Sequence, residues 1–219
     1  MEGTCPHCNY DSARGDQCDN CGKTLDSKEL INPRSKLNPD AKIEFRETEH
    51  LFFKLSEFRD VLLEWLSEGK EHWRPSVINF TRNWLKEGLI DRAVTRDLDW
   101  GIEIPREGYE NKRMYVWFEA VMGYYSASVH WAKNQGKPDE WKKWWENEDS
   151  EHYYFMAKDN IPFHTIIWPA MLSGCGYKLP YDVPANEYLL LDSSQFSKSR
   201  RHAIWIPDYL DRYDPCLLY

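Results

Sequence analysis

Four cysteines in two closely spaced pairs constrain the start of this 219-residue chain more than any other feature. The pattern is Cys5-x2-Cys8-x9-Cys18-x2-Cys21. Two residues between cysteines let one tight turn present both thiolates to an ion, and two such turns complete the tetrahedron of a structural Zn²⁺ site. Binding energy of the order of 10–16 kcal/mol can fold a segment that lacks an apolar core. We therefore predict one structural zinc ion within residues 1–26.

Two alternatives to a metal site remain for these cysteines. Disulfides are disfavoured because the first residues, MEGTCPHC, form no secretory signal segment. A redox-active CxxC is disfavoured because two such pairs are present. A site with four protein ligands has no open position, so we do not expect catalysis there. Residues 27–48, which contain Pro33 and Pro39, are expected to form an extended connection.

The composition indicates a folded chain. It contains 11 Trp, 13 Tyr and 9 Phe, which argues against global disorder despite 28 basic and 36 acidic residues. The net charge of −8 disfavours unspecific coating of nucleic acid. No apolar run approaches the ~20 residues that span a bilayer. We expect a soluble, cytoplasmic protein with no membrane partner.

Hydrophobic periodicity predicts two helices followed by an α/β region. The helices cover Ser56–Gly69, with Ser56 as the N-cap, and Ser76–Gly88. From Arg96 onward, strands are expected at 114–118, 153–156 and 188–191, and helices at 124–133, 161–173 and just after Pro207. Strands that alternate with helices predict a parallel sheet with helices packed on it.

Four short motifs follow one another in this second region. They are Thr95-Arg-Asp-Leu-Asp-Trp-Gly101, Tyr115-Val-Trp-Phe-Glu-Ala120, Lys158-Asp-Asn-Ile-Pro-Phe-His164 and Phe196-Ser-Lys-Ser199. In this order they resemble the second half of the catalytic domain of methionyl-tRNA synthetases, which are class I aminoacyl-tRNA synthetases. The cysteine segment and the helices after it resemble the connective domain inserted in that family.

The resemblance implies a fold class and domain boundaries. The fold is α/β: the second half of a class I synthetase Rossmann-like parallel sheet, with an inserted zinc-knuckle connective domain. Residues 1–94 would form the connective domain, with the zinc knuckle in 1–26. Residues 95–192 would form the second half of the catalytic domain, and 193–219 the catalytic-lysine loop and the start of a helical segment.

The loop around Lys198 is the predicted catalytic element. A lysine there can meet the charge that develops on a leaving pyrophosphate, while serine hydroxyls donate hydrogen bonds. Electrostatic help of this kind is commonly worth about 3–4 kcal/mol per donor. By resemblance, Lys198 is the catalytic lysine, and Asp159, Ser197, Lys198 and Ser199 bind ATP. Taken alone, the motif would be read as a solvated basic loop.

A pocket selective for methionine needs aromatic walls and a polar hydrogen, because its side chain offers only a weak thioether acceptor. His164 and Trp168 are four residues apart and share a helix face. The resemblance places the following residues around the amino acid: Trp117, Ala120, Tyr124, Asn160, His164 and Trp168. Without it, Trp117 and Trp168 would be read as core, His164 as a satisfied core histidine, and Asp159 and Asn160 as caps.

The implied enzyme is a methionine–tRNA ligase, which joins methionine to ATP, with Mg²⁺, as methionyl-adenylate and then transfers methionine to its tRNA. None of the seven histidines begins the His-x-Gly-His motif of the family's first half. We therefore expect this chain alone to be inactive, and a complementary N-terminal half is a partner to test. Gln195 and Ala157 also depart from the family's usual lysine and glycine. The alternative is a zinc-containing RNA- or protein-binding module derived from a synthetase.

Overall fold

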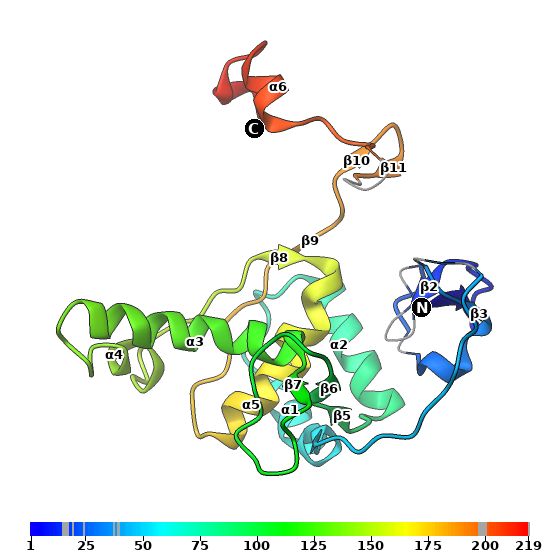
Figure 1. Cartoon of the computed structure of the whole chain (residues 1–219). Helices are drawn as coiled ribbons and strands as arrows, with labels where there is room; N and C mark the ends of the chain where they lie inside the picture. Colours follow the sequence, from blue (N-terminus) through cyan, green and yellow to red (C-terminus); the bar gives the residue numbers. More distant parts are fainter. Residues whose placement is uncertain are drawn as a thin grey trace. The chain divides into compact units, whose positions relative to one another are not determined.

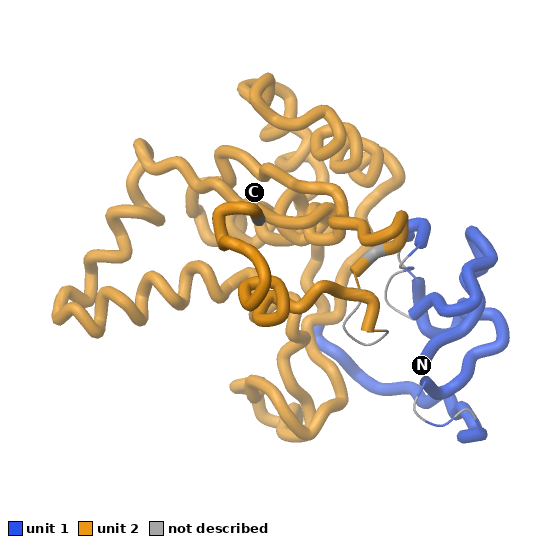
Figure 2. Tube along the Cα trace, turned by 90° about the horizontal axis from the view of Figure 1, so that it is seen from above, with its two compact units in different colours: residues 1–51 blue, residues 52–219 orange. Residues whose placement is uncertain are grey.

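The computed structural model describes residues 1–14, 18, 20–23, 25–36, 38, 40–196 and 201–218. Contacts divide the chain into two compact units, Met1–Leu51 and Phe52–Tyr219, which Figure 2 draws in separate colours. None of the helices in the described ranges is long and apolar enough to cross a membrane.

Unit 1 is built on a small antiparallel sheet in the order β2-β1-β3. Its strands are β1 (Glu2–Thr4), β2 (Ala13–Arg14) and β3 (Ile31–Arg34), and a 3-10 helix covers Ser27–Glu29. Leu25 and Leu30 are buried against Cys5 and Cys18. The segment expected to be an extended connection after residue 26 therefore begins with this 3-10 helix and continues as β3, which pairs with β1 and belongs to unit 1.

Unit 2 contains the two expected helices near its start. A 3-10 helix (Leu55–Phe58) leads into α1 (Arg59–Trp65), and α2 covers Pro75–Glu87. The predicted cap was wrong: the Ser56 hydroxyl and N–H both donate to the Asp91 carboxylate, at 2.6 and 3.1 Å. The second helix ends where glycine predicts it, since Gly88 has a φ of 99°, a conformation that favours glycine.

Two antiparallel pairs of strands accompany these helices, and the first strand, β4, precedes α1 in the chain. Strand β4 (Phe52–Phe53) pairs with β5 (Arg92–Ala93), and β6 (Thr95–Asp97) pairs with β7 (Lys112–Met114).

The strand predicted at 114–118 was wrong, because α3 (Val116–Asn134) already begins there. An unbroken apolar run does not distinguish a buried strand from a buried helix. The burial pattern does: Phe118 and Val121 are buried and Met122 and Tyr125 pack against the same core, which is the i, i+3, i+4, i+7 spacing of a helix. Helix α4 (Lys142–Trp145) follows a turn.

A parallel pair of strands lies at the centre of the expected α/β region. Met156 of β8 (Met156–Ala157) pairs with Ala185 of β9 (Ala185–Asn186) in parallel, and a parallel bridge joins Tyr153 to Asp182. The predicted strand at 153–156 is thus shifted toward its C-terminal end. The chain after β8 is largely helical up to Gly174 and then returns to β9 through an irregular segment, so β8, this helix and β9 form a β-α-β unit (Figure 1).

The helix between these strands is interrupted by a π-helical turn. A 3-10 helix covers Lys158–Asn160, the π-helical turn Phe163–Ile167 and α5 Trp168–Gly174. The Trp168 N–H donates to the carbonyl of Phe163, five residues back. Pro169 accounts for the interruption, since it has no N–H and its ring would clash with the carbonyl four residues before it.

Short elements complete the described chain. The hairpin β10 (Leu190–Leu191) and β11 (Ser194–Gln195) lies within and just after the predicted third strand, and α6 covers Ile206–Leu210 where a short helix was expected. A 3-10 helix covers Pro215–Leu218.

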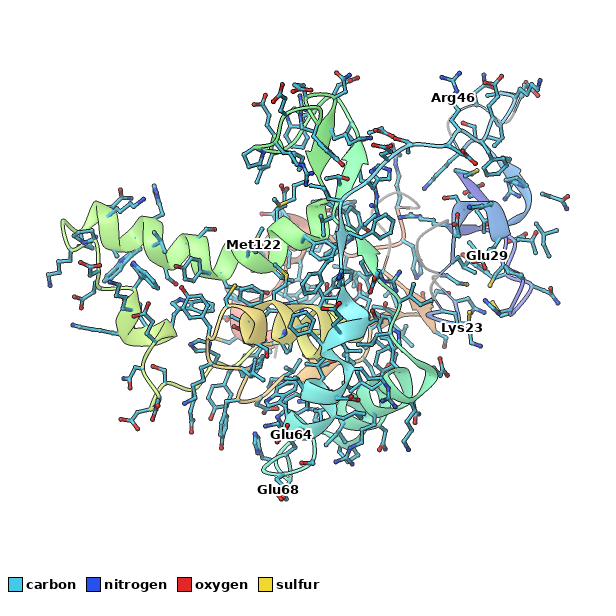
Figure 3. All side chains as sticks on the ribbon, turned by 90° about the horizontal axis from the view of Figure 1, so that it is seen from below. Lys23, Glu29, Arg46, Glu64, Glu68 and Met122 are labelled. Carbon is cyan, nitrogen blue, oxygen red and sulfur yellow. The ribbon has the colours of Figure 1, made fainter. Side chains whose placement is uncertain are left out.

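One hydrophobic core serves most of unit 2. It joins Leu62 of α1 and Val77 of α2 to Ile166 and Leu172 of the central helix, and Met122, labelled in Figure 3, packs against it. Helices α1 and α2, expected to lie in the connective domain, therefore share their core with the β-α-β unit. The boundary between residues 94 and 95 stays a prediction.

Candidate functional site

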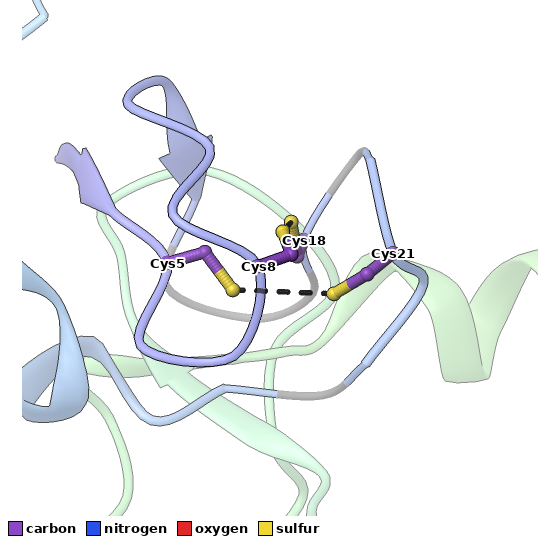
Figure 4. Close-up of side chains that lie close together, drawn as sticks. All are labelled: Cys5, Cys8, Cys18 and Cys21. Atoms are coloured by element: carbon purple, nitrogen blue, oxygen red, sulfur yellow. Dashed lines mark hydrogen bonds between the residues drawn. The ribbon is translucent and has the colours of Figure 1, made fainter.

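The four N-terminal cysteines converge on one point in unit 1 (Figure 4). All four Sγ atoms lie within 4.8 Å of one another. Cys5 Sγ is 3.9 Å from Cys21 Sγ, and Cys8 Sγ is 3.6 Å from Cys18 Sγ. Sulfurs bound at 2.3 Å to a tetrahedral zinc ion are about 3.8 Å apart. The spacing of the thiols therefore fits a metal ion, and these residues could hold one.

The surroundings of the cysteines shift the pKa values of their thiols in different directions. The Asn20 side chain donates to Cys8 Sγ at 3.5 Å, and this bond is the main reason that the pKa of Cys8 is lowered to about 6. Burial instead raises the pKa of Cys18 to about 12 and also raises that of Cys21. The backbone N–H of His7 donates to Cys5 Sγ at 3.4 Å.

In unit 2, the structure brings together Tyr124 from α3 and His164 from the central helix. The Tyr124 hydroxyl lies 2.9 Å from His164 Nε2, and His164 Nδ1 lies 3.0 Å from the carbonyl of Asn160. A carbonyl only accepts, so Nδ1 carries the hydrogen, and Nε2 of the neutral ring accepts from Tyr124. Burial lowers the pKa of His164, which keeps the ring neutral. Only the Tyr124 hydrogen of this pair can turn toward a ligand.

Trp117 and Trp168, the two tryptophans predicted for the pocket, differ in their surroundings. Trp168 is buried, and its indole N–H donates to the hydroxyl of Tyr154 at 3.0 Å. Trp117 is 39% exposed and stacks on Phe163 with ring centroids 4.7 Å apart. Neither Tyr154 nor Phe163 was predicted as a site residue. Phe163 precedes a predicted site residue and could have been found by that adjacency, whereas Tyr154 carried no signal beyond its place in a strand.

The other predicted residues lie around this pair. Ala120 is exposed one turn before Tyr124 on α3. Asp159 and Asn160 belong to the 3-10 helix after β8, where the Asn160 amide donates to the Asp159 carboxylate at 3.3 Å. Neither side chain caps the helix that follows. Asp159 is exposed and Asn160 is half-buried, while the neighbouring Lys158 pairs with Glu187.

Two of the sequence motifs line one hollow of about 340 Å³. Arg96 and Trp100 of the first motif face Tyr115 and Glu119 of the second there. The Arg96 guanidinium lies 3.8 Å from the centre of the Tyr115 ring. One carboxylate oxygen of Glu119 is buried and has no hydrogen-bond partner among the residues the structure describes. The first and second of the four motifs are thus neighbours in space.

Three residues of the predicted catalytic loop, Ser197, Lys198 and Ser199, lie outside the described residues. Their assignment, like that of every predicted site residue in unit 2, stays a prediction.

Comparison with known proteins defines the class and then the family. A family model described as "tRNA synthetases class I (M)" matches residues 1–219, so this α/β chain with its cysteine site belongs to the class I tRNA synthetases. Methionine–tRNA ligase of Dehalococcoides mccartyi is 62% identical over 97% of the chain, and that of Thermomicrobium roseum is 56% identical over 98%. Within the class, the chain belongs to the methionyl-tRNA synthetase family, as the four motifs indicated.

Solved structures agree with this placement. A crystal structure of Mycobacterium tuberculosis methionyl-tRNA synthetase bound by methionyl-adenylate has a TM-score of 0.56 and 26% identity, over 70% of this chain and 28% of that one. A second structure of that enzyme, in complex with methionyl-adenylate, has a TM-score of 0.61 at 23% identity over 81% of this chain and 34% of that one, which shows the fold. The chain spans 38% and 37% of the length of the two curated relatives.

Proposed function

We propose that this chain is part of a methionine–tRNA ligase and supplies the methionine side-chain pocket and the catalytic lysine. The observation that carries the proposal is the Tyr124–His164 pair, which joins α3 to the helix after β8 through one hydrogen bond of 2.9 Å. The close relatives named methionine–tRNA ligase support it. The complete enzyme would form methionyl-adenylate from methionine and ATP, with Mg²⁺, and charge the methionine tRNA in the cytoplasm.

The chemistry of the pair suits a thioether. Sulfur of methionine is a weak hydrogen-bond acceptor that packs well against aromatic rings. Tyr124 is 45% exposed and holds the one hydrogen of the pair that can rotate, while Trp117 offers a half-exposed ring on the same helix. A bound sulfur would accept the Tyr124 hydrogen in competition with His164 Nε2. The buried, neutral His164 would not add a charge that repels or attracts other substrates.

Lys198 would act on the phosphates of ATP. In this proposal Ser197 and Ser199 donate hydrogen bonds to ATP, and Asp159 with Asn160 lies beside the ribose and the amino acid. The lysine would stabilise charge on the leaving pyrophosphate, which needs a positive group in the transition state.

We also propose that the four cysteines hold zinc. The sulfur spacing and the all-thiolate donor set fit this ion. Bound zinc would join the two CxxC turns and so contribute folding free energy to unit 1. It would have no part in the reaction, because four protein ligands leave no position for substrate.

Methionine-dependent ATP–pyrophosphate exchange tests this function. We expect no exchange by the chain alone, because its sequence contains no His-x-Gly-His motif. Mixed with a polypeptide that carries that half from a relative such as the Dehalococcoides mccartyi ligase, the chain should support exchange with methionine. Exchange by the isolated chain would contradict the expected division of the site. A correctly assembled mixture that binds neither methionine nor ATP would contradict the proposed function.

A further inference from the structure

Tyr154 packs against the Tyr124–His164 pair, which we propose to contact the methionine sulfur. It is 7% exposed, whereas its neighbours in the chain, Tyr153 and Phe155, are 49% and 77% exposed. This alternation is that of extended chain with one buried face, here just before β8. The Tyr154 N–H donates to the carbonyl of Asp182 at 3.0 Å, so hydrogen bonding to the neighbouring segment fixes the backbone. The Tyr154 side chain is therefore directed from this extended segment toward the helices.

The Tyr154 ring and hydroxyl contact three residues of the predicted pocket. Its ring centre is 5.1 Å from that of Tyr124, in an edge-on arrangement, and 5.6 Å from that of His164. Its hydroxyl accepts the indole N–H of Trp168 at 3.0 Å. Burial raises the pKa of Tyr154 to about 12, so the hydroxyl stays protonated and neutral at physiological pH. No other residue in the described part of the chain has these three contacts.

We propose that Tyr154 is a positioning residue that sets the selectivity of the pocket for a thioether over a methylene group. It holds the Trp168 indole through its hydroxyl and supports the Tyr124–His164 pair through its ring. Because the bond to Trp168 also fixes the Tyr154 ring, loss of that bond lets the ring shift against Tyr124 and His164 and changes the direction in which the Tyr124 hydrogen points. Hydrogen bonding depends steeply on such angles, whereas apolar contact does not. The inference rests on the proposed function, since it concerns the same pocket.

The test compares Tyr154→Phe with Tyr153→Phe in the whole chain. Both changes remove one hydroxyl and keep the ring, but the Tyr153 hydroxyl donates to Glu151 on the surface and touches no pocket residue. L-methionine and L-norleucine, which carries CH₂ in place of sulfur, are titrated by calorimetry. In parallel, the indole N–H signals are recorded by NMR, with Trp168 assigned through Trp168→Phe.

Tyr154→Phe should lower the preference for methionine over norleucine by about three- to ten-fold, the effect of one neutral hydrogen bond. It should also shift the Trp168 indole signal. Tyr153→Phe should do neither. An unchanged preference, or equal weakening of both ligands, would overturn the inference while leaving the proposed function in place. If the wild-type chain and its assembly with the complementary half bind neither amino acid, the proposed function fails and the inference fails with it.

Discussion

The tautomer of His164 makes the stability of unit 2 depend on pH in a defined direction. His164 is 5% exposed, donates from Nδ1 to a carbonyl and accepts at Nε2 from Tyr124. Protonation would place a second hydrogen at Nε2, where the Tyr124 hydrogen now lies. Burial lowers the pKa of His164 below its ordinary 6.5. The unfolded chain therefore takes up this proton more readily than the folded one, and acid favours unfolding.

The size of the effect follows from one linked proton. Above about pH 6.5 the ring is neutral in both states, and its contribution to stability is complete. Below that pH the contribution of His164 to the free energy of unfolding should fall by at most about 1.4 kcal/mol per pH unit. The fall ends where the pH reaches the pKa of His164 in the folded chain. All 11 tryptophans lie between Trp65 and Trp205, so tryptophan fluorescence during urea unfolding follows unit 2 alone. Unfolding curves at pH 7.5 and at two or three lower values give the slope.

Two variants isolate the contribution of His164. His164→Gln keeps an amide that can donate to the Asn160 carbonyl but removes the titrating ring. Its slope of unfolding free energy against pH should differ from that of wild type by the contribution of one proton. His130→Gln removes an exposed histidine of α3 and should leave the wild-type slope. Equal slopes for wild type and His164→Gln would refute the assignment of His164 as a buried, neutral ring.

Three further predictions concern other parts of the molecule. A chelator, or Cys18→Ser, should unfold unit 1 while the tryptophan fluorescence of unit 2 is unchanged, and mass spectrometry under native conditions should find one zinc ion per chain. The buried Thr81 hydroxyl lies 2.8 Å from that of Thr165 and 2.9 Å from the Val77 carbonyl, so Thr81→Val should lower the free energy of unfolding by about 1 kcal/mol, measured by urea titration. In the assembly that supports pyrophosphate exchange, Lys198→Ala should reduce the rate by about 10²–10³-fold, and an unchanged rate would remove this lysine from the mechanism.

Local rules predicted the elements whose signals lie in adjacent residues. The cysteine spacing predicted the convergence of four thiols, since CxxC turns act locally. Apolar periodicity predicted α2 and its end at Gly88. The same rules failed at residues 114–118, where five apolar residues in a row fit either a strand or a helix, and only the packing of α3 on the core decides between them.

Features that depend on distant residues could not be predicted from the sequence. The hydrogen bond between Tyr124 and His164 spans 40 positions, and the bond that ties Tyr154 to Trp168 spans 14. Neither pair has a spacing that a helix or strand would place in contact. The π-helical turn before Pro169 also depends on distant residues. Proline predicts that the helix is interrupted, but the packing of the surrounding core decides whether the interruption is a kink, a 3-10 turn or a π-helical turn.

The residues of the predicted pocket fall into two groups by their burial, a difference that the sequence did not predict. Trp117 and Tyr124 are 39% and 45% exposed on α3, whereas His164 and Trp168 are 5% and 3% exposed. Exposed rings can contact a ligand directly, while a buried ring acts on a ligand through its neighbours. Under the proposed function, substitutions on α3 should therefore change which side chains the pocket accepts. Substitutions at the buried positions should change how strongly the pocket distinguishes sulfur from carbon, because they move the hydroxyl hydrogen that faces the ligand.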